Sequence, residues 1–425
     1  MKVTNILERL RQNEEDIYLW FCIGIVYTMV FWTAGNSILT IALSAFWLFV
    51  SKKKLDLSTR RIRLMLVFVS LYIVCIIGML YTSNIDEGLF RLQQKSALLV
   101  FPLIFSTTQL STEKFKGVSF HFIIAVSLSC IVSLLSGVYK YWTTGIADAL
   151  NKEQLMVFPD MNPPVTGLFC LLAIIFLLSP RYRPPVLPVV RLIAVALISG
   201  FIMLLSVRLI VFCLLVLLLI YAFIYIKSIL YRLVFLFGLI LFAVISIVSI
   251  PTLNRQWKEL VDVSGESKIA LDQDSSLGRA WGGKSIRLAL WTCSMDVIKR
   301  NWLFGVGTGD VQDSLQASYE NRKFYFASRF NKYNAHNQSI EFWIGNGLPG
   351  LFIFILCMVL PAVLFHNKPG VLEYFLFLAL AFTISMTETL LNVNKGIIWY
   401  SFFNSIFAFV YLNPDVNSAR TNKSL

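Results

Sequence analysis

A histidine stands where the longest polar segment of the chain meets an apolar run. The segment extends from Pro251 to His336, and Asn337, Glu341 and the sequence GNGLPG at 345–350 follow at the start of the next apolar run. An imidazole can accept a proton near neutral pH, which suits it to general base catalysis. Its place at this boundary suggests a substrate with a tail in lipid and a head in water. The alternative is a structural histidine, the commoner role for an isolated one.

Two arginines are candidates for binding an anion. Arg208 is the one charged residue within 192–226, near the middle of that apolar stretch. Such an arginine costs on the order of 1 to 3 kcal/mol unless it reaches the interface or an anion. We therefore expect either an interfacial anchor or a guanidinium that holds a phosphate through two hydrogen bonds.

Arg287 lies at the start of a segment with helical spacing, 285–298, where backbone N–H groups favour anions. A helix-surface arginine is the simpler interpretation there. The apolar face of this helix is expected to comprise Leu290, Cys293 or Ser294, Val297 and Ile298.

Other patterns in the polar segment offer weaker chemistry. The sequence from Leu303 to Asp310 is rich in glycine, but no Lys-Ser or Lys-Thr follows it and no strand pattern precedes it. A tight turn that lets two backbones approach is therefore favoured over a nucleotide-binding loop. Asp272 and Asp274 could hold a metal ion, in a stretch typical of a loop. His336 has no second histidine or cysteine at the spacing of a zinc site. We expect no metal and no cofactor.

The composition indicates which elements must position these residues. Hydrophobic residues make up 57% of the chain and charged residues 14%, and the mean hydropathy is +0.71. Several uncharged stretches reach the roughly 18 residues needed to cross about 30 Å of hydrocarbon. The net charge of +13 is spread over short loops beside these stretches, where cations are topology signals rather than a nucleic-acid surface. The chain is therefore expected to be a polytopic membrane protein that binds membrane lipid and no nucleic acid.

Apolar runs and loop charges together predict an all-α fold of about 12 transmembrane helices, in a single integral membrane domain of residues 1–425. The basic loop from Lys52 to Arg63 is expected in the cytoplasm, which places both termini there and the large loop 251–337, between spans 9 and 10, outside. The expected spans are two within 17–50, then 64–82, 97–111, 118–138, 164–179, two within 192–226, 233–250, 338–365, 372–391 and 396–412.

Taken in order, these motifs resemble those of the O-antigen ligase and polymerase superfamily, polytopic enzymes that use undecaprenyl-diphosphate-linked glycans. The resemblance is clearest over residues 200–365, while Tyr81 to Asn84 and the run around Pro102 are similar to the family's early region. The matching motifs are Ser206 and Arg208 at a tight outer turn, Arg287 and Trp291 on a helix, Leu303 to Gly309, and His336, Asn337, Glu341 and Gly347 to Gly350.

The resemblance implies an inverting, metal-independent transfer of an undecaprenyl-diphosphate-linked glycan to lipid A core or a related acceptor. The reaction would take place on the periplasmic face of a bacterial inner membrane. His336 is implied as the catalytic residue, and Arg208 and Arg287 as the ligands of the diphosphate. The turn reads Ser-Val-Arg where the family commonly has Ser-Arg-Gly, which leaves the placement of Arg208 open. The implied supporting residues are Asn337, Glu341, Gly305, Gly307 and Gly309.

Several activities fit this sequence. A glycan ligase, a polymerase of repeat units and a protein O-glycan ligase would share the donor machinery and differ in the acceptor. A polysaccharide transporter or flippase belongs to another class, and transporters tend to carry ionisable groups at mid-membrane and repeated halves. The span centres here are nearly free of charge and the two halves show no repeat. These features favour a glycan-transferring enzyme over a transporter. The sequence does not separate the three enzymes, of which the glycan ligase is our first choice.

Overall fold

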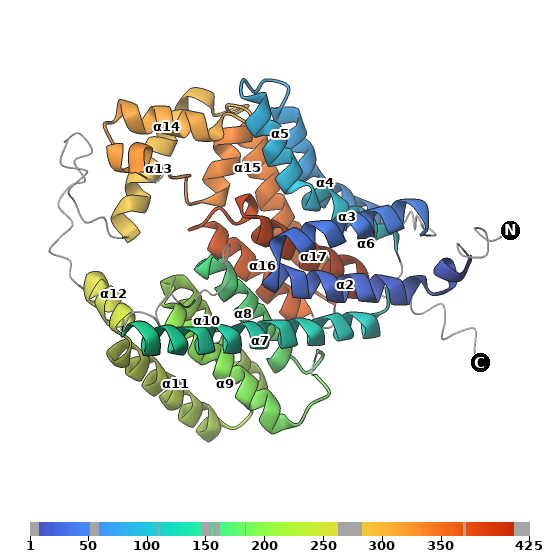
Figure 1. The fold of residues 1–425 in the computed structure, drawn as a ribbon, viewed down its shortest axis with the longest axis vertical. Helices are drawn as coiled ribbons and strands as arrows, with labels where there is room; N and C mark the ends of the chain where they lie inside the picture. The colour runs from blue at the N-terminus through green and yellow to red at the C-terminus, as the bar shows by residue number, and fades with distance from the viewer. Residues whose placement is uncertain are drawn as a thin grey trace. The chain divides into compact units, whose positions relative to one another are not determined.

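The computed structural model describes residues 8–51, 59–108, 110–145, 155, 162–182, 184–261, 283–330, 332–368 and 371–411. Throughout these ranges the regular structure is helical and contains no strand, which confirms the all-α class (Figure 1). Six of the described helices, α4, α7, α9, α10, α11 and α15, are long and apolar enough to cross a membrane. The chain is therefore a polytopic membrane protein.

The helices have the following bounds in chain order. They are α2 (Glu14–Phe31), α3 (Thr33–Phe49), α4 (Thr59–Gly78), α5 (Ile85–Lys95), α6 (Ala97–Thr107), α7 (Thr112–Thr144), α8 (Pro163–Leu178), α9 (Pro188–Leu205), α10 (Arg208–Tyr225), α11 (Ile229–Ser249), α12 (Pro251–Val261), α13 (Gly283–Asn301), α14 (Val311–Asn321), η5 (Phe326–Phe330), α15 (Gln338–Phe365), α16 (Val371–Ser385), η6 (Leu390–Asn392), α17 (Asn394–Ile406) and η7 (Phe407–Tyr411).

Most of the predicted spans coincide with one helix each. The two spans within 17–50 are α2 and α3, although the break falls at Trp32 rather than within 33–37. The two spans within 192–226 are α9 and α10, separated by a turn as expected. The last three spans correspond to α15, α16 and α17 with η7. Besides the six long helices, α3, α8 and α16 are shorter apolar helices.

The segment around Pro102 differs from its expected form. α6 has 11 residues, a length of about 16 Å and roughly half of a hydrocarbon core. Its last carbonyl groups, at Phe105 and Ser106, accept hydrogen bonds from the buried guanidinium of Arg61, which satisfies the helix end. The expected spans 64–82 and 97–111 leave residues 83–96 as the loop that joins them. It is instead the amphipathic helix α5, whose first turn is capped by the Asn84 side chain.

The chain divides into two compact units, one of residues 1–17, 40–111 and 266–425, and the other of residues 18–39 and 112–265. Helix α17 lies at the centre of the first unit, because its residues from Lys395 to Ile406 are all buried. It packs against α6, while α4 packs against α15. The Ser401 hydroxyl of α17 donates a 2.6 Å hydrogen bond to the carbonyl of Ala97 at the start of α6.

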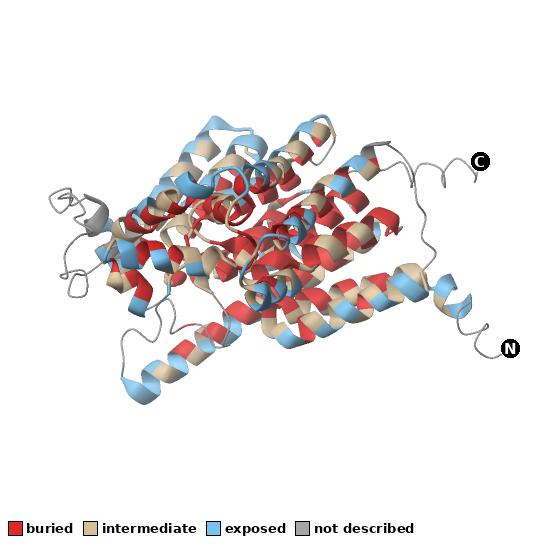
Figure 2. Cartoon of the chain, turned by 90° about the horizontal axis from the view of Figure 1, so that it is seen from above, coloured by how far each residue is buried: buried red, intermediate tan, exposed pale blue. Residues whose placement is uncertain are grey.

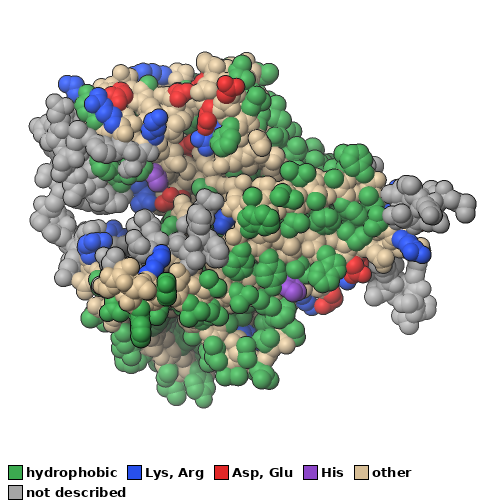
Figure 3. Space-filling view, in the orientation of Figure 1, with side chains coloured by type: hydrophobic (Ala, Val, Ile, Leu, Met, Phe, Trp, Pro, Cys, Tyr) green, Lys and Arg blue, Asp and Glu red, His purple; other side chains and the backbone are tan. Residues whose placement is uncertain are grey.

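The second unit has a buried central helix and an exposed apolar surface. Helix α8 is buried along its whole length from Val165 to Leu177, whereas the apolar side chains of α11 are mostly exposed. In Figure 2 many helices carry buried residues along one side and exposed or intermediate residues along the other. Hydrophobic side chains cover the visible surface of α9 and α11 in Figure 3. An apolar face of this extent is stable when lipid covers it.

Residues 283–330 of the polar segment fold onto the start of α15 in the first unit. Helices α13 and α14 pack on each other and on α15, around a buried cluster that includes Leu290, Cys293, Tyr319 and Ile344. The predicted apolar face of α13 is buried, which confirms its helical spacing. Charged side chains gather where Figure 1 places α13, α14 and α5 (Figure 3). On this surface the Arg322 guanidinium hydrogen-bonds Asp296 and holds the pKa of that carboxyl below its ordinary value.

Candidate active site

His336 lies in the short connection that leads into α15, with its imidazole against a carboxylate. Its Nδ1 atom is 3.2 Å from Oε2 of Glu388, and the imidazole side chain is 27% exposed. The backbone is in the left-handed region at φ +44°. The backbone N–H of His336 donates to Oδ1 of Asn334 at 2.9 Å. A non-glycine residue held in this region costs of order 1 to 3 kcal/mol, so surrounding contacts must fix the connection.

Glu388 joins His336 to Arg287. Its other oxygen, Oε1, accepts from Nη2 of Arg287 at 2.9 Å, and Nε of Arg287 donates to the carbonyl of Thr387 at 3.3 Å. The side chains of Arg287 and Glu388 are 32% and 19% exposed, so the group is reachable yet partly shielded from water. The structure therefore brings together two of the predicted site residues through a third. Sequence reasoning missed Glu388, although a carboxylate inside a predicted span, 372–391, was the signal that could have found it.

Residues around His336 hold its backbone in place. Asn337 caps α15 by accepting from the N–H of Ile340 at 3.1 Å, and its amide donates to the carbonyl of Met386 at 3.0 Å. Asn334 donates to the Thr389 hydroxyl at 2.9 Å. The indole of Trp291 on α13 donates to the carbonyl of Ala335 at 3.1 Å, so the helix that carries Arg287 also contacts the connection.

The glycine-rich segment is a backbone-to-backbone contact, which confirms the tight-turn prediction. The N–H groups of Val306 and Gly307 donate to the carbonyls of Ile344 and Gly345 at 2.8 and 2.9 Å. Gly305 has φ +77°, and a Cβ there would lie 2.5 Å from the carbonyl carbon of Gly345. No side chain fits such an approach. Gly305 and Gly307 thus dock the segment after α13 onto the first turns of α15.

We expect Gly309→Ala to destabilise the protein by about 1 to 3 kcal/mol, the usual cost of overpacking. A Cβ at Gly309 would lie 2.1 Å from the carbonyl oxygen of Asn84, and the N–H of Gly309 donates to the Thr82 hydroxyl at 2.9 Å. Gly200→Ala is the matched control, because its Cβ would meet no atom within 4 Å and α9 favours alanine. Thermal unfolding in detergent measures both variants. Equal unfolding temperatures would contradict the packing role of Gly309.

The remaining predicted residues lie elsewhere. Glu341 accepts from Nδ2 of Asn392 at 2.8 Å rather than contacting His336. Arg208 belongs to the second unit, where it is the first residue of α10. The turn before it is held by Ser206, which has φ +51° and a 2.7 Å hydrogen bond between its hydroxyl and that of Thr252. Asp272 and Asp274 lie outside the described residues.

Comparison with known proteins finds a family over the segment that carries most of these motifs. Residues 192–355 match the family model described as O-Antigen ligase, a range that includes Arg208, Arg287 and His336. No curated protein matches the chain. A match to this family suggests a glycosyl-transferring enzyme, and the six long apolar helices agree with a membrane protein. The match over residues 192–355 thus supports the resemblance of this chain to the O-antigen ligase superfamily.

Proposed function

We propose that this protein transfers a glycan from undecaprenyl diphosphate to lipid A core or a related acceptor, on the periplasmic face of the inner membrane with both termini in the cytoplasm. The observation that carries the proposal is the Glu388 carboxylate, which contacts both the His336 imidazole and the Arg287 guanidinium. A base and an anion-binding group held by one carboxylate suit a reaction in which a hydroxyl is deprotonated while a diphosphate departs.

His336 acts as the general base in this proposal. A carboxylate accepts hydrogen bonds only, so its contact with Nδ1 selects the tautomer that carries its proton on Nδ1. Nε2 then bears the lone pair. This nitrogen takes the proton of the acceptor hydroxyl as the hydroxyl oxygen attacks the anomeric carbon of the donor. The bond from that carbon to the diphosphate breaks, and inversion at the carbon follows from a single displacement.

Arg287 stabilises the departing diphosphate in this proposal, and the resemblance implies the same role for Arg208. Negative charge grows on the leaving oxygen, and fixed guanidinium groups in a partly shielded site oppose it at little reorganisation cost. Glu388 holds the Arg287 side chain at its Nη2 atom. Arg208 starts α10, where the helix dipole also favours an anion. With arginines to neutralise the leaving group, the reaction needs no metal ion.

Transfer by the purified protein in proteoliposomes tests the proposal. The donor is an undecaprenyl-diphosphate-linked glycan, and the acceptors offered in parallel are lipid A core, a second lipid-linked repeat unit and an acceptor protein. We expect transfer to lipid A core, undiminished by EDTA. Transfer to a repeat unit or to protein instead would identify a polymerase or a protein ligase. Loss of activity in EDTA, restored by magnesium or manganese, would assign the chemistry to Asp272 and Asp274.

A further inference from the structure

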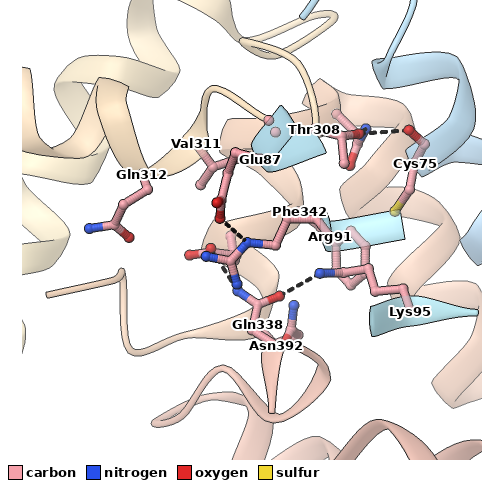
Figure 4. A pocket seen from close by; sticks show the side chains of 14 residues that line it. Cys75, Glu87, Arg91, Lys95, Thr308, Val311, Gln312, Gln338, Phe342 and Asn392 are labelled. Carbon is pink, nitrogen blue, oxygen red and sulfur yellow. Dashed lines mark hydrogen bonds and ion pairs between the residues drawn. The ribbon is translucent and has the colours of Figure 1, made fainter. Parts of the chain in front are cut away.

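A polar pocket in the first unit lies apart from the His336–Glu388 contact. It has about 30 Å³ of room at the scale of a water molecule, and all the space between its lining atoms, including solvent at its open mouth, is about 430 Å³. Figure 4 shows the side chains of α5, the start of α15 and Asn392 around it. The enclosed part has room for about two waters, at roughly 10 to 15 Å³ each. A group the size of a hydroxyl or hydroxymethyl therefore fits inside, and a larger body would remain in the mouth.

Two buried polar atoms of the pocket lack a partner within the described part of the chain. Nε2 of Gln338 is a donor without an acceptor, and Oε2 of Glu341 is an acceptor without a donor. The other atom of each group is engaged, since Oε1 of Gln338 accepts from the N–H of Leu391 at 2.7 Å and Oε1 of Glu341 accepts from Asn392 at 2.8 Å. Gln338 has no exposed surface. Leaving such groups unpaired is costly, so the pocket needs an occupant.

The chemistry of the pocket specifies that occupant. A hydroxyl both donates and accepts, so one hydroxyl can satisfy Gln338 and Glu341 together. The ionic side chains around it are balanced in sign: Arg91 pairs with Glu87 at 2.7 Å, and Lys95 donates to Oδ1 of Asn392 at 2.7 Å. A phosphate would bring two or more negative charges to Glu341. A neutral polyhydroxylated molecule meets no such repulsion.

The pocket is connected to the candidate active site by one segment of chain. Glu388 contacts His336, and Asn392, four residues later, lines the pocket and binds both Lys95 and Glu341. The other residue of that contact, His336, precedes the pocket residue Gln338 by two positions at the start of α15. A molecule anchored in the pocket would therefore contact residues that lie two to four positions in the sequence from His336 and Glu388.

We propose that this pocket is a saccharide subsite, in which Gln338 and Glu341 bind a hydroxyl or hydroxymethyl group of a neutral sugar of the glycan substrate. The sugar ring lies in the mouth beside Glu87 and Arg91. The identity of the ligand as a glycan rests on the proposed function, while the preference for a neutral hydroxyl rests on the pocket itself.

Exchanging donor and acceptor in the pocket tests the subsite. In Glu341→Gln the amide oxygen stays with Asn392, so an NH₂ group replaces the free acceptor. The hydroxyl oxygen can accept from both amides, but its own proton loses the charged acceptor. In Gln338→Glu two acceptors face it. We expect each change to weaken saccharide binding by about tenfold, the order expected for a hydrogen bond with a charged partner. The double variant has one donor and one acceptor again, and binding should recover to within about threefold of the unmodified protein.

The measurement uses the full-length protein in detergent, with glucose, galactose and N-acetylglucosamine as probes. Dissociation constants follow from the dependence of the unfolding temperature on sugar concentration. Sugars also stabilise proteins by exclusion from the surface, but that part is the same in every variant. Glu320→Gln on α14 is the matched control and should bind like the unmodified protein. Glu320 contacts Ser328 and does not line the pocket.

Inorganic pyrophosphate, measured in the same way, separates this proposal from the proposed function. Its binding should be unchanged in the pocket variants and weakened in Arg287→Ala. Equal saccharide binding in the unmodified protein and both single variants, no recovery in the double variant, or no saccharide binding at all would overturn the subsite and leave only water in the pocket. Saccharide binding with the expected pattern but no pyrophosphate binding would instead overturn the diphosphate site.

Discussion

Replacing His336 with alanine is expected to lower the turnover of glycan transfer by about 100-fold or more, the range for a positioned proton acceptor. Donor affinity should change little, because the proposal assigns donor binding to arginines. The measurements are the transfer rate at saturating donor and the donor affinity in proteoliposomes, with equal amounts of folded protein. A well-folded His336→Ala protein with near-normal turnover would show that the residue only fixes the entrance to α15.

Arginine variants provide the contrasting pattern. Arg287→Ala should weaken donor binding as well as turnover, because its guanidinium is proposed to contact the diphosphate before and during the reaction. Arg287→Lys should recover only part of both, since an ammonium lacks the planar fork that also meets Glu388 and the Thr387 carbonyl. If His336→Ala and Arg287→Ala gave the same changes in rate and affinity, the division between base and anion ligand would be wrong.

Local patterns predicted much of the fold. Runs of apolar residues located most of the membrane helices, because the hydrocarbon thickness fixes their length and excludes charge. The spacing of Leu290, Cys293 and Val297 indicated the buried face of α13 correctly. Glycines at 305 and 307 indicated a close backbone approach, which the structure shows between this segment and α15.

Contacts between distant segments were not predictable in the same way. Glu388 lies 52 residues after His336 in the sequence, and no periodicity relates the two. A hydropathy pattern assigns residues 372–391 to one span and treats its carboxylate as a tolerated exception, whereas α16 ends at Ser385 and leaves Glu388 in a turn before η6. Likewise, the last carbonyls of the short helix α6 accept hydrogen bonds from Arg61 of another helix. Both features arise from pairing that only the folded chain creates.

Glu388→Gln should lower turnover by about 100-fold or more while it keeps the shape of the site. Arg287 donates to Oε1, so the amide oxygen of glutamine should take that position and its NH₂ group should face Nδ1 of His336. An NH₂ group donates, which forces the proton of the imidazole onto Nε2. A protonated Nε2 cannot accept the proton of the acceptor hydroxyl. The wrong tautomer removes the base without removing the histidine, as an Asp-to-Asn change does in a serine protease triad.

A double variant distinguishes this role from simple support of the fold. If Glu388 acts through His336, then Glu388→Gln combined with His336→Ala should be no slower than His336→Ala alone, because the two residues work as one unit. Independent structural effects would instead multiply. The turnover of Glu388→Asp should lie between those of the unmodified protein and Glu388→Gln, since the shorter side chain cannot reach both Nδ1 and the guanidinium. Glu113→Gln on α7, at a carboxylate that is 79% exposed, is the matched control and should transfer glycan at the unmodified rate. Multiplied losses in the double variant would show that Glu388 supports Arg287 or the turn after α16 and does not set the tautomer of His336.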